Sequence, residues 1–237
     1  MKDITGAIAA EQQYIHDRID LALDVSIYDY LRPCGYDDLD EYANDKKDYQ
    51  LTQLDMEIYL TDMLDIEDRV EANVINKIPS IFIPTADTTF AWIGERDALD
   101  TTLFEQNNVQ TYNMRYLGGT IISGPEDFSI AIITPDYIDI CSTYYMERIC
   151  KFLQQYFPDA HYDRNDIIVE GKKVAGTVMR RIDGVLVFAT QISFVDRTEV
   201  ISLLCPPHGD KVPGCIDPTV LSKSVLQNEI LSWFEEE

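Results

Sequence analysis

The arrangement of strand-like and helix-like segments along the chain constrains its fold most strongly. From Ile78 onward, short runs rich in Ile, Phe, Tyr and Thr are separated by turn residues, as is typical of strands in a sheet. These runs are "IPSIFIP", "TFAWI", "TYNMR" and "FSIAIIT" and, after one helical stretch, "DIIVE", "KVAGTVMR" and "GVLVFATQISF". Strands grouped around one central helix predict an α+β fold with a mixed, mainly antiparallel sheet and packed helices, rather than a doubly wound parallel sheet.

Apolar spacing predicts three helices, and a capping signal predicts a fourth. The first helix runs to about Tyr30 and has apolar residues at Ile4, Ile8, Ile15, Ile19, Leu23 and Ile27. A second helix has them at Met56, Tyr59, Leu60, Met63 and Leu64. A third, which ends near Pro158, has them at Ile138, Cys141, Tyr145, Ile149, Phe152 and Tyr156. Asp217, followed by Pro218, resembles the N-cap of a fourth helix running through Trp233.

The segment between the first two predicted helices divides the chain. Pro33 and Gly35 break the helical period in "RPCGYDDLDEYANDKKDY", and the residues after them are acidic and poor in apolar side chains, so a linker or exposed loop is predicted. We therefore expect an acidic helical N-terminal extension with its linker over residues 1–49 and a second, larger domain over residues 50–237.

Charge and cysteine content exclude several classes of protein. A formal net charge of -23 repels polyanions, which argues against nonspecific binding to nucleic acid or anionic membranes, although a local basic site could still bind one small anion. The 5 cysteines show no C-x-x-C spacing, so no zinc or other metal ligands and no disulfide framework are predicted. No signal peptide and no run of about 20 apolar residues is present, which predicts a soluble cytoplasmic protein. The Rossmann and P-loop glycine motifs are absent as well.

A basic cluster stands out in this acidic chain. Its members are Arg164, Lys172, Lys173, Arg180 and Arg181, interleaved with Gly171 and Gly176. One interpretation is an anion pocket, because lysine is a flexible point charge for phosphate and glycine lets an anion approach the backbone. The other is a solvated hairpin whose lysines point into water.

A glycine pair forms the second candidate site. In "MRYLGGTIISGPEDFS", Gly118 and Gly119 permit backbone conformations closed to other residues, and Arg115 could bind a carboxylate or phosphate. The same segment could equally be a tight turn between strands with an exposed arginine. Residues alone leave both interpretations open.

Taken together, the two candidates resemble the lipoate-protein ligase and octanoyl transferase family, which also includes the catalytic domain of biotin-protein ligases. The resemblance covers about residues 54–221. "MRYLGGTII" is similar to the R-R-x-x-G-G-G-A-V loop of the family, and "RNDIIVEGKKVAG" is similar to its R-N-D...G-x-K-x-x-G element. "IPSIFIPTADTTFAWIG" and "VFATQISF" are similar to flanking family segments. The chain departs from the family pattern at Met114, Thr120, Gly124, Phe188 and Ala189.

The resemblance implies an enzyme that uses ATP and Mg²⁺ to activate lipoate, or a similar acyl acid, as an acyl-adenylate. It then transfers the acyl group to a lysine of a lipoyl carrier domain from a 2-oxoacid dehydrogenase or a glycine cleavage protein. The resemblance places Lys173 on the essential lysine, beside the acyl carbonyl and the α-phosphate. The implied substrate-binding residues are Arg115, Gly118, Gly119, Ile121, Ile122, Asn165, Asp166, Gly176 and Thr190, with Asp166 orienting Mg²⁺ or the nucleotide.

Two alternatives stay open at this level. "DKVPGCIDPTVLS" is similar to the octanoyl transferase segment whose cysteine forms a thioester without ATP, which would make Cys215 a nucleophile. Here the order is Gly214-Cys215 instead of Cys-Gly, and a structural thiol is the competing interpretation. A non-catalytic binding or structural module of the same fold is the third possibility, since it would fit the departures in the substrate loop.

Overall fold

The computed structural model describes residues 2–21, 26–62, 65–94, 99, 101–114, 120–136, 138, 140–141, 143–204 and 211–235. The chain divides into two compact units. The smaller unit comprises residues 1–54 with 233–237, and the larger unit comprises residues 55–232.

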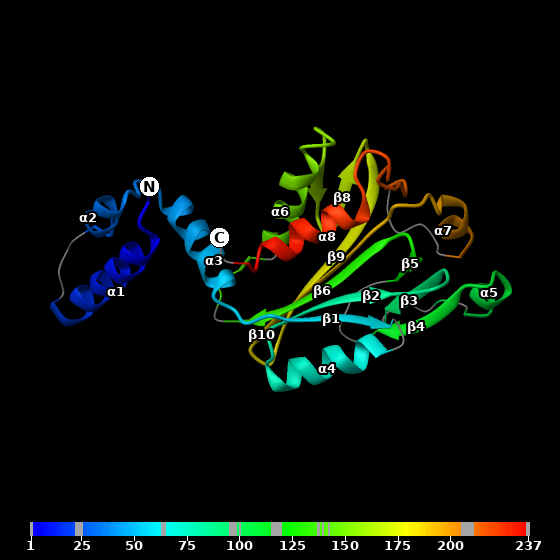
Figure 1. Ribbon diagram of the computed structural model, residues 1–237, viewed down its shortest axis with the longest axis horizontal. Coiled ribbons are helices and arrows are strands. Elements are labelled where there is room, and N and C mark those ends of the chain that lie inside the picture. The colour runs from blue at the N-terminus through cyan, green and yellow to red at the C-terminus, as the bar shows by residue number, and fades with distance from the viewer. Residues whose placement is uncertain are drawn as a thin grey trace. The chain divides into compact units, whose positions relative to one another are not determined.

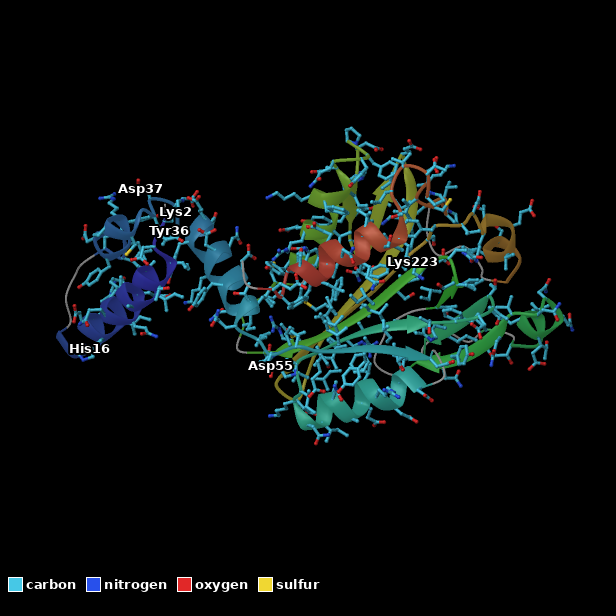
Figure 2. The ribbon with its side chains drawn as sticks, in the orientation of Figure 1. Lys2, His16, Tyr36, Asp37, Asp55 and Lys223 are labelled. Atoms are coloured by element: carbon cyan, nitrogen blue, oxygen red, sulfur yellow. The ribbon has the colours of Figure 1, made fainter. Side chains whose placement is uncertain are left out.

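The small unit is helical. Its elements are α1 (Ile4–Leu21), α2 (Tyr28–Leu31), the 3-10 helix η1 (Arg32–Cys34) and α3 (Leu39–Thr52). Tyr36 and Tyr42 are buried beside Ala7 and Leu31, and the tyrosine hydroxyls donate hydrogen bonds of 2.9 Å to Asp45 and 2.8 Å to Glu11, respectively. The ammonium of Lys2 lies 4.9 Å from the centre of the Tyr36 ring, and both residues are labelled in Figure 2.

The linker predicted over residues 32–49 is wrong from residue 39 onward, because residues 39–49 lie in α3. Asp38 caps the helix by accepting the N–H of Asp40 at 2.8 Å, and Asp40 and Glu41 place negative charge in its first turn. Two buried residues, Tyr42 and Leu51, anchor this otherwise polar helix. The first helix is also shorter than predicted, since α1 ends at Leu21 and α2 begins at Tyr28.

The helix predicted around Met56 is also wrong, because residues 57–62 form strand β1 (Glu57–Asp62), which pairs in parallel with β2 (Ser80–Thr85). Tyr59 packs against the core and Thr61 is buried, whereas Ile58 and Leu60 are exposed, which is the alternation of a strand. Met63 and Leu64, also part of that prediction, lie outside the described residues. Helix α4 (Ile66–Asn76), which the sequence did not predict, follows.

A seven-stranded sheet organises the large unit, with strand order β1-β2-β6-β10-β9-β8-β7. Its remaining strands are β6 (Phe128–Pro135), β7 (His161–Asp163), β8 (Asp166–Val169), β9 (Lys172–Ile182) and β10 (Val185–Ile192). Every neighbouring pair is antiparallel except β1 with β2. The predicted α+β fold with a mixed, mainly antiparallel sheet is confirmed.

Helices cover both faces of this sheet (Figure 1). On one face, Ile66, Val70 and Val74 of α4 pack against alternate residues of the central strands, such as Val187 and Ala189 of β10. On the other face, Phe188 lies 4.8 Å, between ring centres, from Tyr145 of α6 (Tyr144–Leu153). Strand β10 is buried along its whole length because both of its faces are covered.

A three-stranded sheet, order β4-β3-β5, lies beside the main core. Its strands are β3 (Phe90–Gly94), β4 (Gln110–Met114) and β5 (Ile121–Ser123), and the remaining helices of the unit are α5 (Thr101–Gln106), α7 (Thr198–Leu204) and α8 (Lys223–Ser232). Phe90 and Trp92 join the core under α4, whereas Ala91 packs with Phe104 and Ile122 on the opposite side of β3.

Two predicted helix boundaries are corrected. Asp217 does not cap α8, since its carboxylate accepts the N–H and hydroxyl of Thr219 at 2.8 and 2.7 Å, which closes a separate turn before α8 begins at Lys223. The central helix α6 begins at Tyr144, after the buried Ile138 and Ile140. Among the described residues, no helix combines the length and apolar character needed to cross a membrane.

Candidate active site

The basic cluster lies on a tight hairpin between β8 and β9. Glu170 and Gly171 both adopt positive φ, 52° and 72°, which is the backbone of a two-residue hairpin turn that glycine favours. The strand register shifts between Ile167 and Ile168, so that Lys173 pairs with Ile168 and Ala175 pairs with Ile167. This β-bulge re-aims side chains at the start of β9, where Lys173 stands.

Lys173 is held by an aspartate of the adjacent strand. Its Nζ lies 2.7 Å from Oδ1 of Asp166, and the two side chains retain 40% and 21% of their accessible surface. Gly176 borders the lysine, because a Cβ at that position would lie 3.7 Å from Lys173 Nζ, an ordinary contact distance. The ammonium is therefore oriented by a partner and still accessible to a ligand.

A second lysine completes the arrangement. Lys211 Nζ lies 3.0 Å from Oδ2 of Asp166, 2.9 Å from Oδ2 of Asp163 and 2.8 Å from the carbonyl oxygen of Asp163. The hydrogen bond from Lys211 lowers the pKa of Asp163. Burial lowers the pKa of Lys211, but its hydrogen bonds to Asp163 and Asp166 outweigh that effect and the net shift is upward. Both shifts favour the charged forms of Asp163 and Lys211.

Two adjoining cavities meet at Lys173. The larger, of about 350 Å³, is lined by Thr120, Ile121, Ile122, Lys173, Val174, Ala175, Gly176, Gln191, Ser193, Ile201, Ser202, Lys211, Pro213 and Gly214. The smaller, of about 190 Å³, is lined by Trp92, Thr120, Ile121, Asp166, Lys173, Gly176, Thr177, Val178, Ala189, Thr190 and Gln191. Because Lys173 and Gly176 line both, a ligand that extends through both cavities passes the ammonium.

The structure brings six of the predicted site residues to these cavities, namely Lys173, Asp166, Gly176, Ile121, Ile122 and Thr190. The side chain of Asn165 is exposed, and its carbonyl oxygen accepts the N–H of Thr177 at 2.7 Å, so Asn165 braces the hairpin. Arg115, Gly118 and Gly119 lie outside the described residues, and their role in holding the adenylate stays a prediction.

Among the cavity residues that sequence reasoning missed are Trp92, Gln191 and Lys211. Gln191 carried a usable signal, since it is a polar residue within the apolar run of β10, is only 5% exposed, and donates to the Ser193 hydroxyl at 3.1 Å. Lys211 carried none, because its partner Asp166 is 45 residues away in the chain.

Cys215 shows no activation as a nucleophile. Burial, and then the negative charge of Asp196, raise the pKa of its thiol, which disfavours the thiolate. Cys215 does not line either of the two cavities described above. The preceding Gly214 approaches β9 so closely that a Cβ there would lie 2.6 Å from Cβ of Lys172, which accounts for glycine at this position.

The structure shows the surroundings of three departures from the family pattern: Gly124, Phe188 and Ala189. A Cβ at Gly124 would lie 2.4 Å from Nη2 of Arg197, so the guanidinium occupies the space that a side chain at 124 would need. Phe188 packs on Tyr145 under α6, while its neighbour Ala189 lines the smaller cavity. The residues at these positions differ in chemistry from those of the family pattern, but the cavities beside Lys173 remain open.

The fold is that of lipoate-protein ligases. The structure superposes on lipoate-protein ligase A bound with ATP with a TM-score of 0.61 and 15% identity, covering 76% of this chain and 84% of the other. A bi-partite lipoate protein ligase from Thermoplasma acidophilum, described with its E2 lipoyl domain, gives a TM-score of 0.59 and 16% identity, covering 77% and 83%. P. falciparum LipL1 in complex with lipoate gives a TM-score of 0.58 and 13% identity. The superposition covers 76% of this chain and 61% of LipL1, which is less than two thirds of that protein.

Residues 60–209, more than half of the chain, match the lipoyl protein ligase A/B catalytic domain family. The chain belongs to this family, as the sequence resemblance predicted. A comparison with curated protein sequences gives no match.

Proposed function

We propose that this protein activates lipoate, or a similar acyl acid, with ATP and transfers the acyl group to a lysine of a carrier domain. One observation carries the proposal: the Lys173 ammonium, oriented by Asp166, stands where two cavities meet. Solved relatives with lipoate and with ATP support the choice of ligands, and the relative described with its E2 lipoyl domain supports the choice of carrier.

The two cavities suit the two parts of an acyl-adenylate. Trp92, Ile121, Val178 and Ala189 give the smaller one an apolar wall for an acyl chain. The larger one extends from Lys173, whose accessible cationic side chain suits a nucleotide's phosphates. Together they lie within the size range of typical small-molecule sites, about 300 to 1,000 Å³.

The chemistry proceeds in two balanced steps. The acyl carboxylate attacks the α-phosphorus of ATP, a P–O bond forms, and pyrophosphate leaves. The carrier's lysine amine then attacks the acyl carbonyl, the new amide forms, and AMP leaves with the bonding electron pair while the amine loses a proton. Negative charge grows near the α-phosphate in the first step and near the carbonyl oxygen in the second, and a fixed ammonium stabilises both.

Mg²⁺, which the family resemblance implies, would be bound chiefly by the nucleotide phosphates. Within the described ranges, no three histidine, cysteine or carboxylate side chains gather to hold a metal ion. Magnesium is commonly bound by one or two carboxylates plus substrate phosphates, so this arrangement is compatible with it. Its contribution would be to neutralise phosphate charge.

The test pairs Lys173→Met with the neighbouring Lys172→Met. Lys172 is exposed, and only its aliphatic stem packs on Gly214, which methionine preserves. Wild type and Lys172→Met should release pyrophosphate with lipoate, ATP and Mg²⁺ and should melt at higher temperature with these ligands. Lys173→Met should lose about 100- to 1,000-fold in rate. Absence of any ligand-dependent stabilisation in a panel of lipoate, octanoate and biotin would contradict the proposal and favour a non-catalytic module.

A further inference from the structure

We propose that Lys211 is a positioning residue that acts through Asp166 and thereby sets the location and availability of the Lys173 ammonium. The inference deepens the proposed function and rests on it for its catalytic consequence. The juxtaposition that carries it is a single carboxylate whose two oxygens bind two different lysines.

The contacts of Lys211 fix it firmly. Its side chain is 16% exposed, and its ammonium meets three oxygen atoms, two from Asp163 and one from Asp166, within 3.0 Å. An ammonium has three N–H donors, so these contacts match its full donor capacity. Lys211 therefore stays with the two aspartates, whereas Lys173, with 40% of its side chain exposed, is the lysine that a ligand can reach.

The carboxylate of Asp166 is shared. Oδ1 forms an ion pair with Lys173 and Oδ2 accepts a hydrogen bond from Lys211, and this division fixes the rotation of the carboxylate about its own bond. Without Lys211, Asp166 is free to turn both oxygens toward Lys173. The ion pair would then tighten and draw the ammonium away from the junction of the cavities.

The charge of Lys211 also favours binding of an anionic ligand beside Lys173. Asp163 and Asp166 carry two negative charges, and Lys173 and Lys211 carry two positive charges, so the cluster is neutral. Removal of the Lys211 charge leaves the cluster with one net negative charge, which repels a carboxylate or phosphate. A purely packing role for Lys211 would not produce this repulsion.

The main chain couples the two lysines as well. The N–H of Lys173 donates to the carbonyl oxygen of Val212 at 2.8 Å, and the N–H of Gly214 donates to the carbonyl oxygen of Lys173 at 2.9 Å. Residues 211–214 thus lie along the first residues of β9 and form one wall of the larger cavity. The ion pairs of Lys211 with Asp163 and Asp166 hold one end of that wall in place.

The test is a double-mutant cycle between Lys211→Met and Asp166→Asn, with adenylate formation as one readout. Lys211→Met should lower the rate by about 100-fold, the loss expected from a small misplacement of a reacting group. If Lys211 acts through Asp166, the double variant should be no slower than Asp166→Asn alone. Fully additive losses would overturn the proposal, because they would indicate an independent contact between Lys211 and the ligand. Lys211→Arg, which keeps the charge, should recover part of the rate.

A second readout needs no enzymatic activity. The amine of Lys173 can be acetylated in the free protein with an N-hydroxysuccinimide ester, and the rate followed by peptide mass spectrometry with Lys172 as internal reference. Lys211→Met should slow labelling of Lys173 relative to Lys172, and adding Asp166→Asn should restore it. An unchanged ratio in Lys211→Met overturns the proposal. If the wild type forms no adenylate, the proposed function fails, while labelling still decides the coupling between Lys211 and Lys173.

Discussion

Two aspartates of the large unit, Asp127 and Asp166, each bind basic side chains, but their surroundings differ. Asp127 has a fully buried side chain. It accepts hydrogen bonds from the Ser123 hydroxyl at 3.3 Å, the Gly124 N–H at 3.0 Å, the Phe194 N–H at 2.8 Å and the Arg197 guanidinium at 2.5 Å. Asp166 keeps 21% of its side-chain surface and binds two lysines beside large cavities.

The difference separates a structural ion pair from an exchangeable one. Arg197 keeps only 8% of its side-chain surface, and a planar guanidinium held by Asp127 and Glu126 is a fixed link between the turn after β5 and the segment after β10. Lys173 is a flexible point charge with an open side, and a ligand's anionic group could replace part of its contact with Asp166. The cavity next to Asp127 is also small, about 40 Å³.

The largest effect should come from breaking the buried pair. Arg197→Met leaves the Asp127 charge buried without its cation, so we expect a loss of about 3 to 5 kcal/mol in the free energy of unfolding. Urea denaturation measures it. Glu126→Gln is the matched control, because Glu126 is 58% exposed and such surface pairs are worth about 0 to 1 kcal/mol. A loss below 1 kcal/mol in Arg197→Met would show that Asp127 is satisfied without the arginine.

The reverse pattern should hold at Lys173. Lys173→Met should change the free energy of unfolding by only about 0 to 1 kcal/mol, because the pair with Asp166 is partly exposed. Its effect should fall on adenylate formation, with a loss of about 100- to 1,000-fold that corresponds to about 2.7 to 4 kcal/mol in the transition state. Urea denaturation and pyrophosphate release on the same preparations separate the two quantities. If Lys173→Met lost as much stability as Arg197→Met, the Lys173–Asp166 pair would be structural, like the Arg197–Asp127 pair.

Two glycines give a smaller and more local comparison. In Gly124→Ala the added Cβ would lie 2.4 Å from the Arg197 guanidinium, so we expect a loss of about 1 to 3 kcal/mol in unfolding free energy. In Gly176→Ala the added Cβ would lie 3.7 Å from Lys173 Nζ, an ordinary contact distance, so stability should change little. Thermal denaturation compares the two variants directly. Equal losses would mean that the space around Arg197 is not a constraint.

The sequence predicted most strands of the sheet because they depend on local patterns, and it singled out Lys173 because the segment around it resembles a family motif. The β8–β9 hairpin follows from alternating residues around Gly171, and Lys173 follows from a motif within that hairpin. Strand β1 was missed because Met56, Tyr59 and Leu60 also fit a helical period, and the parallel pairing with β2 that selects the strand is not local. Helix α3 was missed because its polar surface hides two buried residues and an aspartate cap.

The two aspartate sites could not be distinguished from the sequence. Arg197 and Asp127 are 70 residues apart, and Lys211 and Asp166 are 45 residues apart. Neither pairing has a local spacing signature, since each depends on how distant strands and loops meet. The composition of the basic cluster also placed Arg181 in the candidate anion pocket, whereas the structure shows Arg181 bound to Asp136 and to the carbonyl oxygen of Ile140.

The smallest effect is a pH dependence at Asp163, whose partner Lys211 also binds Asp166. The hydrogen bond from Lys211 holds the pKa of Asp163 below its ordinary value of 3.8. Because the folded-state pKa is lowered, the stabilising contribution is present above the unfolded pKa and is lost as the pH falls through the folded pKa. Carbon-13 NMR titration of the Asp163 carboxyl should give a midpoint below 3.8 in the wild type and a higher midpoint in Lys211→Met. The same midpoint in both proteins would show that Lys211 does not bind Asp163 in solution. Asp166 would then be the only carboxylate left of the two that the structure pairs with Lys211.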